Sequence, residues 1–457
     1  MLSLSEVARM VGGTLVGDGA THLASVGTDS RNAAQHSLFV ALKGESFDGH
    51  GFAVQACRDG AAAALLDHAV EGIASAVVVS DTKLALGQLA AAWRARFTLP
   101  LIAVTGSNGK TTVTQMIAAI LRAHVQEAAF ATHGNLNNDI GVPLTLLRLR
   151  AAHKVGVVEL GMNHPGEIAT LANIARPTVA MVNNAQREHQ EFMKSVAEVA
   201  AENGTVLIAL PDDGIAVINA DDEFASLWRG LAGSRKIISF GLNERADVRA
   251  TYELGLFGAH LTLHTPHGDC RTELRIAGLH NVRNACAAAA SAIAAGVPLA
   301  AIAQGLRDFV PVAGRLVKHV TANGAVVIDD TYNANPDSVR AAIDVLAQVD
   351  TQHGGTRVLV LGRMGEVGDQ GPAFHHEVGA YAKARGIEHL LTFGAETRAT
   401  VAGYGAGAQY FDDIEALNTT ATQLAQPHTT LLIKGSRSAR MERVVAHLLG
   451  APTGTHH

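Results

Sequence analysis

The chain has 457 residues, of which 48% are hydrophobic and 17% are charged, and its formal net charge is −6 at pH 7. This length exceeds one ordinary hydrophobic core and indicates about three domains. The net negative charge and the lack of a long basic run argue against a nucleic-acid-binding surface. No uncharged apolar run reaches the ~18 residues of a membrane span, and the N-terminus lacks a signal-peptide pattern, so we expect a cytoplasmic protein.

The cysteines are three in number, Cys57, Cys270 and Cys286, and none of them has C-x-x-C spacing. An odd number of cysteines without C-x-x-C spacing indicates neither a disulfide framework nor a zinc site. We expect buried thiols.

Residues 1–98 are predicted to form a small mixed α/β domain. A short helix runs from Ser3 to Val11, and a glycine-rich break at 44–51 precedes a helix that ends at Asp59. Polar and basic residues on the expected loops are the candidate ligand contacts of this domain. They are Ser30, Arg31, Lys43, Asp48 and His50. On composition alone, a solvated surface explains such residues better than a binding site does.

The stretch LIAVTGSNGKTTVTQMIAAIL, residues 101–121, combines an apolar run, a glycine-rich loop and helical apolar spacing. It predicts a strand, a phosphate-binding loop and a helix, in which Lys110 adds an ammonium and Thr111 a hydroxyl for Mg²⁺. The loop is a variant, because the general pattern has Gly where this chain has Val104. We expect a nucleoside triphosphate site made by Thr105, Gly106, Ser107, Asn108, Gly109, Lys110, Thr111 and Thr112.

A second apolar strand ends in Glu159. Carboxylates at the C-terminal ends of buried strands face the ligand crevice of an open α/β sheet, so Glu159 is predicted to hold Mg²⁺ beside Thr111. A strand-end acid that merely faces solvent is the alternative. Further on, the S-x-x-E pattern of Ser195 and Glu198 predicts the start of a helix.

The rest of the central domain, residues 99–312, contains polar groups that the residues alone leave undecided. Asn135, Asn137 and Asn138 lie in one loop before a helix expected to start at a proline, and they are equally typical of turns. His280, Asn281 and Asn284 open an apolar helix and could simply cap it. His189 is one of 22 histidines and means little by itself.

Residues 313–457 repeat a strand and helix alternation and predict a third, Rossmann-like domain after an interdomain joint near Arg315. Polar side chains follow two of its strands, and these are Asp330, Tyr332, Asn333, Asn335, Lys434, Ser436 and Arg437. Glycines at 362, 365 and 368 follow another strand. Their G-x-x-G-x-x-G spacing lacks the close first pair of the dinucleotide fingerprint, which argues against NAD binding.

Four motifs together, TGSNGKTT, ELGMNHPGEI, DDTYNANPDS and KGSRSARMERV, resemble those of the Mur ligase superfamily, over essentially the whole chain. The resemblance implies an ATP- and Mg²⁺-dependent amide ligase of peptidoglycan precursor synthesis. It further implies that a carboxylate is activated as an acyl phosphate, and that the substrates are a UDP-N-acetylmuramoyl tripeptide and D-alanyl-D-alanine. We expect a monomer.

The resemblance also implies roles for the undecided residues. In the first domain, Ser30, Arg31 and Lys43 would lie near the uridine diphosphate, in segments that also contain Asp48 and His50. The asparagine loop at 135–138 would bind the muramoyl peptide. His189 would contact a second Mg²⁺, and His280, Asn281 and Asn284 would lie on the adenine side. Arg315 would contact the γ-phosphate, and Asp330 would contact the nucleotide. The other polar strand-end residues of the third domain would bind the substrate.

Two departures from the family pattern affect these expectations. Many Mur ligases carry a CO₂-carbamoylated lysine 14 residues after the histidine, where this chain has Asn203, and Arg363 replaces an aspartate. We predict activity that does not depend on CO₂. Two alternatives stay open: a folylpolyglutamate-type ligase, whose first domain is the ATPase domain itself, and a non-catalytic nucleotide-dependent binding module.

Overall fold

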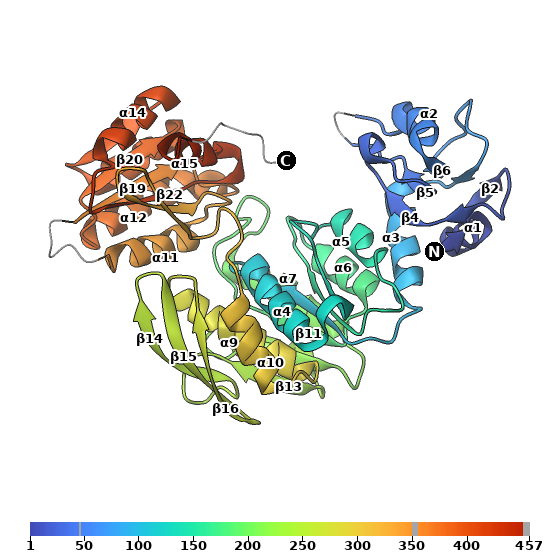
Figure 1. The fold of residues 1–457 in the computed structure, drawn as a ribbon, viewed down its shortest axis with the longest axis horizontal. Helices are drawn as coiled ribbons and strands as arrows, with labels where there is room; N and C mark the ends of the chain where they lie inside the picture. The colour runs from blue at the N-terminus through green and yellow to red at the C-terminus, as the bar shows by residue number, and fades with distance from the viewer. Residues whose placement is uncertain (45–46, 350–354, 451–457) are drawn as a thin grey trace.

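The computed structural model describes residues 1–44, 47–349 and 355–450, and it has three lobes. In Figure 1 the N-terminal lobe (blue) and the C-terminal lobe (orange to red) lie on either side of the central lobe. Each lobe is built on its own sheet with helices packed against it. The three-domain α/β architecture is therefore confirmed.

The N-terminal lobe contains a five-stranded sheet of order β2-β7-β6-β5-β4. The strands of this sheet are β2 (Thr14–Val16), β4 (Ser25–Gly27), β5 (Ser37–Val40), β6 (Ala61–Leu66) and β7 (Ala76–Val78), and a separate antiparallel pair is formed by β1 (Leu2–Ser3) and β3 (His22–Leu23). Its helices are α1 (Leu4–Val11), α2 (His50–Asp59) and α3 (Thr82–Arg94). Ser3 and Glu6 form a capping box that starts α1, one residue after the predicted start.

The central lobe contains a parallel sheet of order β13-β12-β11-β8-β10-β9. These strands are β8 (Leu101–Thr105), β9 (Ala129–Ala131), β10 (Val155–Glu159), β11 (Val179–Val182), β12 (Ile215–Asn219) and β13 (Lys236–Phe240). The helices are α4 (Lys110–Val125), α5 (Gly141–Leu146), α6 (Glu167–Ala175), α7 (Val196–Ile208), α8 (Ala225–Ala232), α9 (Leu279–Ala294) and α10 (Leu299–Asp308). An antiparallel sheet of β14 (Arg249–Gly255), β15 (Gly258–Thr265) and β16 (Gly268–Leu274) packs beside α10.

Strand β8 explains why the sheet is covered on both faces. Ile102 and Val104 belong to the core that contains α4, α9 and α10, whereas Leu101 and Ala103 belong to the core that contains α3 and α6. All four side chains are fully buried, as is typical of parallel strands. The chain order reverses at β8, and the crevice at the carboxyl ends of such strands is where open α/β sheets bind ligands.

The C-terminal lobe contains a sheet of order β17-β18-β22-β19-β20-β21, parallel except for the edge strand β17. Its strands are β17 (Val317–Val320), β18 (Val326–Asp330), β19 (Thr356–Gly362), β20 (His389–Phe393), β21 (Ala408–Phe411) and β22 (Thr429–Lys434). Its helices are α11 (Pro336–Ala347), α12 (Gly371–Ala384), α13 (Arg398–Tyr404), α14 (Ile414–Leu424) and α15 (Glu442–Leu448). The proposed domain limits at 98/99 and 312/313 fall between α3 and β8 and between α10 and β17. Residues 451–457 of the third domain, and 45–46 of the 44–51 break, lie outside the described residues.

Local expectations were mostly met. Ser195 caps α7 by accepting a hydrogen bond from Glu198 N, as predicted. The expected proline start of α5 was wrong, because the helix begins at Gly141, two residues before Pro143. Pro143 fits there, since the first turn of a helix does not need its N–H groups. Within the described residues, no helix is both long and apolar enough to cross a membrane.

Candidate active site

The phosphate loop connects β8 to α4 through a backbone that requires glycine. Gly109 has φ +82°, and a Cβ atom there would lie 2.7 Å from Asn284 Oδ1 and 2.8 Å from Asn183 Nδ2. A side chain at Gly109 would therefore meet both strain and a buried amide pair. Ser107 to Thr112 line one cleft, and the N-terminus of α4 lies at it.

Lys110 is the first residue of α4, and its ammonium is held close to the loop. Nζ donates to Gly106 O at 2.6 Å and Ser107 O at 2.9 Å, and it lies 3.1 Å from Glu188 Oε2. The carboxylate of Glu188 is buried, and its Oε1 has no hydrogen-bond partner among the residues that the structure describes. Glu188 therefore completes a charged site that the sequence analysis did not include.

Thr111 and Glu159 meet as predicted. Thr111 Oγ1 donates to Glu159 Oε1 at 3.1 Å, and Asn137 Nδ2 donates to the same oxygen at 2.8 Å. Glu159 is 1% exposed, and its Oε2 is without a hydrogen-bond partner in the described part of the chain. A buried carboxylate oxygen with unused capacity, beside a hydroxyl and an amide, is a donor set that fits Mg²⁺.

Arg315 reaches the same point from the joint before the C-terminal lobe. Its Nη2 donates to Thr111 Oγ1 at 2.9 Å, and its guanidinium lies 4.2 Å from the centre of the Tyr332 ring. Stacking on an aromatic ring holds a guanidinium in one orientation. Arg315 is thus fixed beside the expected metal and phosphate positions.

A chain of buried amides supports the other side of the loop. Asn284 Nδ2 donates to Asn281 Oδ1 at 3.0 Å, and Asn183 Nδ2 donates to Asn284 Oδ1 at 3.1 Å and to Asn108 O at 2.7 Å. His280 stands at the end of this chain, 3.1 Å from Asn281 Nδ2. Burial, together with the charge of Lys434, lowers the pKa of His280 to about 4, so the ring is neutral at neutral pH.

The central and C-terminal lobes are joined at this site. Asn335 Nδ2 donates to Asn108 Oδ1 at 2.9 Å, so a residue of the third domain contacts the phosphate loop directly. His189 Nδ1 lies 2.7 Å from Glu366 Oε2, and the imidazole holds the pKa of Glu366 below its usual range. Arg187, which follows β11, pairs with two acids of the C-terminal lobe.

Two strand ends of the C-terminal lobe also meet. Lys434 Nζ donates to Asp330 Oδ2 at 2.6 Å and to Asn333 O at 2.8 Å, since the residues face each other on the paired strands β18 and β22. Ser436 is buried, and its backbone N–H donates to Arg363 O at 2.9 Å. Arg363 itself lies 3.2 Å from Glu396, an exposed pair.

Most of these groups surround one cleft of about 590 Å³ between the two lobes. The predicted residues that line it are Ser107, Asn108, Gly109, Lys110, Thr111, Thr112, Asn137, Glu159, His189, His280, Asn281, Asn284, Arg315, Asp330, Tyr332, Asn333, Asn335 and Lys434. Outside its lining, among the described residues, are Thr105, Gly106, Asn135, Asn138, Ser436 and Arg437. Asn138 instead supports the turn before α5, where its Oδ1 accepts from Gly141 N at 2.8 Å.

The candidates of the N-terminal lobe are separate from this cleft. Ser30 and Arg31 lie in a single helical turn, where Arg31 pairs with Asp29. Lys43 and Asp48 form an isolated β-bridge, and Asp48 accepts from the backbone N–H and the ring of His50. His50 is buried, with both ring nitrogens in contact with groups of the chain.

Asn203 does not line the cleft, although the family pattern would place a metal-binding side chain there. Its Oδ1 accepts from Thr105 Oγ1 and, at 2.9 Å, from Gly106 N, while its Nδ2 donates to Val199 O at 3.1 Å. The side chain is 1% exposed. Asn203 therefore supports the phosphate loop from behind, and its carbonyl is already used twice.

The comparisons with known proteins agree with this arrangement. Family models match in chain order: "Mur ligase family, catalytic domain" at residues 22–94, "Mur ligase middle domain" at 104–292 and "Mur ligase, glutamate ligase domain" at 314–437. A protein of Escherichia coli (strain K12), named UDP-N-acetylmuramoyl-tripeptide--D-alanyl-D-alanine ligase, is 42% identical over 450 residues, which are 98% of each chain. The chain belongs to the Mur ligase family. The resemblance drawn from its motifs is confirmed.

Other relatives of this Mur ligase point the same way. A protein of the same name from Haemophilus influenzae is 36% identical and covers 98% of both chains. A crystal structure of MurF from Acinetobacter baumannii matches with a TM-score of 0.91 at 36% identity, over 98% of this chain and 99% of that one.

Sequence reasoning did not select several residues that the structure of this Mur ligase places in or next to the cleft lining. They follow β11, and they are Asn183, Asn184, Gln186, Arg187 and Glu188. The available signal was a run of polar residues directly after a four-residue buried strand. Because β11 pairs with β8, its end had to lie beside the phosphate loop.

Proposed function

We propose that this Mur ligase joins D-alanyl-D-alanine to a UDP-N-acetylmuramoyl tripeptide, with conversion of ATP to ADP and phosphate, in peptidoglycan precursor synthesis. One observation carries the proposal. A variant phosphate loop faces a buried Thr111 and Glu159 pair, and the C-terminal lobe closes over both through Arg315 and Asn335. Relatives that bear the name of this activity match 98% of the chain.

The chemistry explains why ATP is needed. A carboxylate does not react usefully with an amine, because oxide is a poor leaving group. Transfer of the γ-phosphoryl group to the terminal carboxylate of the tripeptide gives an acyl phosphate and ADP. The amine of D-alanyl-D-alanine then attacks the acyl carbon, and phosphate leaves as the amide forms. Most of the catalysis is positioning and charge neutralisation.

The residues of the cleft suit that task. The ammonium of Lys110 would exchange its contact with Glu188 for the β- and γ-phosphate oxygens of ATP, and Arg315 would neutralise the γ-phosphoryl group as it transfers. Thr111 and Glu159 would hold Mg²⁺, which supplies positive charge to the phosphate oxygens. His280, Asn281 and Asn284 would face the adenine side.

We propose further roles that follow the family pattern. His189 would act at a second Mg²⁺, and Ser30, Arg31, Lys43, Asp48 and His50 would contact the uridine diphosphate. The loop with Asn135, Asn137 and Asn138 would contact the muramoyl peptide. Asp330 would contact the nucleotide. The remaining third-domain candidates would bind substrate, and they are Tyr332, Asn333, Asn335, Lys434, Ser436 and Arg437. The protein would act as a cytoplasmic monomer.

The test is a phosphate-release assay in which each component is omitted in turn. Release should require Mg²⁺-ATP, the UDP-muramoyl tripeptide and D-alanyl-D-alanine together, and the amide product should appear in equal amount. Full activity with a folate and glutamate would move the chain to the folylpolyglutamate type. ATP binding without phosphate release under any of these conditions would favour a binding module.

A further inference from the structure

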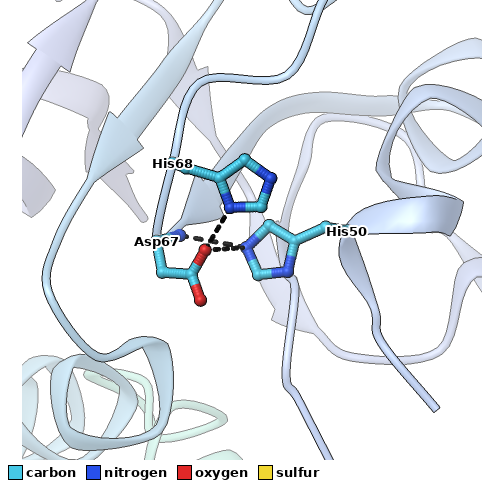
Figure 2. A group of neighbouring side chains, drawn as sticks. All are labelled: His50, Asp67 and His68. Atoms are coloured by element: carbon cyan, nitrogen blue, oxygen red, sulfur yellow. Dashed lines mark hydrogen bonds and ion pairs between the residues drawn. The ribbon is translucent and has the colours of Figure 1, made fainter.

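A cluster of two histidines and an aspartate lies in the N-terminal lobe, apart from the cleft. His50 is the first residue of α2, and Asp67 and His68 directly follow β6. One possible ligand atom from each residue lies within 4.8 Å of the others. Figure 2 shows that both imidazole rings turn a nitrogen toward the same carboxylate oxygen.

The spacing is close to that of a metal site. His50 Nε2 lies 3.1 Å from Asp67 Oδ1, and His68 Nδ1 contacts the same oxygen. Zinc ligands lie ~2.0–2.2 Å from the metal, so neighbouring ligand atoms in a tetrahedral site are roughly 3.3 Å apart. His50 and Asp67 already have this separation. The His68 side chain is 61% exposed and can move outward by the small distance required.

The orientation of His50 is set by its surroundings. Its Nδ1 lies 2.6 Å from Asp48 Oδ1, and its Nε2 accepts from Asp67 N at 3.0 Å. Both contacts place the ring proton on Nδ1, which leaves the Nε2 lone pair directed at Asp67. A carboxylate behind a histidine is the usual support of a metal-ligating imidazole. A metal ion would replace the hydrogen bond from Asp67 N.

We propose that His50 Nε2, the Asp67 carboxylate and His68 Nδ1 bind one transition-metal dication of the Zn²⁺ class, with a fourth position open to water. Two imidazoles and one carboxylate favour such ions over Mg²⁺ or Ca²⁺, which prefer oxygen ligands. The ion would connect the start of α2 to the end of β6. This metal site is separate from the cleft between the central and C-terminal lobes, and a bound ion would stabilise the N-terminal lobe.

Calorimetric titration of the full-length, untagged protein with Zn²⁺ tests the proposal, in excess Mg²⁺ so that the site at Thr111 and Glu159 is occupied. We expect one binding event whose affinity falls at least tenfold in His68→Ala. Because His68 is exposed, this change should leave the fold intact, which circular dichroism checks. His124→Ala, an exposed histidine at the end of α4, is the matched control and should bind as the natural chain does.

X-ray absorption at the zinc edge gives a second readout, since the bound ion should show two imidazole ligands in the natural chain and one in His68→Ala. Loss of affinity in His68→Ala with no change in His124→Ala would support the site. Equal affinity in the natural chain and His68→Ala would overturn it. Absence of a stoichiometric binding event in the natural chain would also overturn it, and the cluster would then be a hydrogen-bonded network only.

Discussion

Arg187 is expected to hold the C-terminal lobe on the central lobe, and its removal should reveal how much catalysis depends on that contact. Its Nη2 lies 2.6 Å from Asp337 Oδ1 and its Nη1 lies 2.7 Å from Glu377 Oε2, on α11 and α12. The guanidinium also lies 5.2 Å from the centre of the Phe374 ring. One cation thus bridges two acids of the opposite lobe, and Arg187→Ala removes all these contacts at once.

The expected loss of docking free energy in Arg187→Ala follows from how far the ion pairs are buried. Arg187 is 22% exposed, so its ion pairs fall between the ~0–1 kcal/mol of surface pairs and the ~3–5 kcal/mol lost on breaking a buried one. A loss of about 2 kcal/mol corresponds to roughly 30-fold in the docking equilibrium of the two lobes. If docking completes the site, kcat/KM should fall by up to that factor. The difference from the natural chain should shrink at high salt, because screening weakens partly exposed pairs.

The assay is steady-state phosphate release at low and high ionic strength. Arg340→Ala is the matched control, because Arg340 Nη1 lies 2.9 Å from the same Glu377 but within the C-terminal lobe. It should change kcat/KM less than threefold. An Arg187→Ala protein with kcat/KM within twofold of the natural chain would refute the view that this contact governs docking.

Three further outcomes are expected. Lys110→Ala should abolish turnover while the protein stays folded, and near-normal phosphate release by a folded variant would contradict its role. Turnover of the natural chain should be the same in CO₂-stripped buffer and with added bicarbonate across a Mg²⁺ titration, because Asn203 has no amine to carbamoylate. Rescue of the natural chain by bicarbonate would show that another lysine forms a carbamate. Burial lowers the pKa of His375 to about 4 in the folded chain, whereas the pKa in the unfolded chain is ~6.5. The contribution of the neutral imidazole to the free energy of unfolding is therefore complete above pH ~6.5 and is lost as the pH falls toward 4. At pH 5 the loss is about 2 kcal/mol, and melting curves should show a smaller decrease in Tm from pH 7 to pH 5 in His375→Gln than in the natural chain.

The sequence was most informative where one local pattern determines both the fold and the chemistry. The loop before Lys110 needs glycines for its backbone conformation. A buried strand that ends in Glu159 places its last side chain at the ligand crevice. The observed hydrogen bond between Thr111 and Glu159 joins two residues that were predicted to lie side by side. Strand and helix alternation was likewise enough to predict the α/β class of each lobe.

Contacts between distant segments were beyond such reasoning. The polar run after β11 contains Arg187 and Glu188, but their partners belong to other elements and are identified only when β11 is placed beside β8. Asn203 illustrates the same limit. Its sequence position suggested the metal site, but the orientation of α7 turns the amide toward Gly106 behind the loop, a direction that helical periodicity alone does not determine.

The loop residue Asn108 connects these observations. Its backbone accepts a hydrogen bond from Asn183 and donates one to Asn184, and its side chain donates to Gln186, all after β11. Its side chain also contacts Asn335 at the start of α11. A movement of the C-terminal lobe therefore acts directly on the loop that would bind the phosphates, through the side-chain amides of Asn335 and Asn108. Arg315 makes a second direct link at Thr111. Both links end within the phosphate loop and the first turn of α4, so docking of the lobes and ordering of the phosphate site should occur as one event. The Arg187 contact at the edge of the cleft is therefore expected to change catalysis.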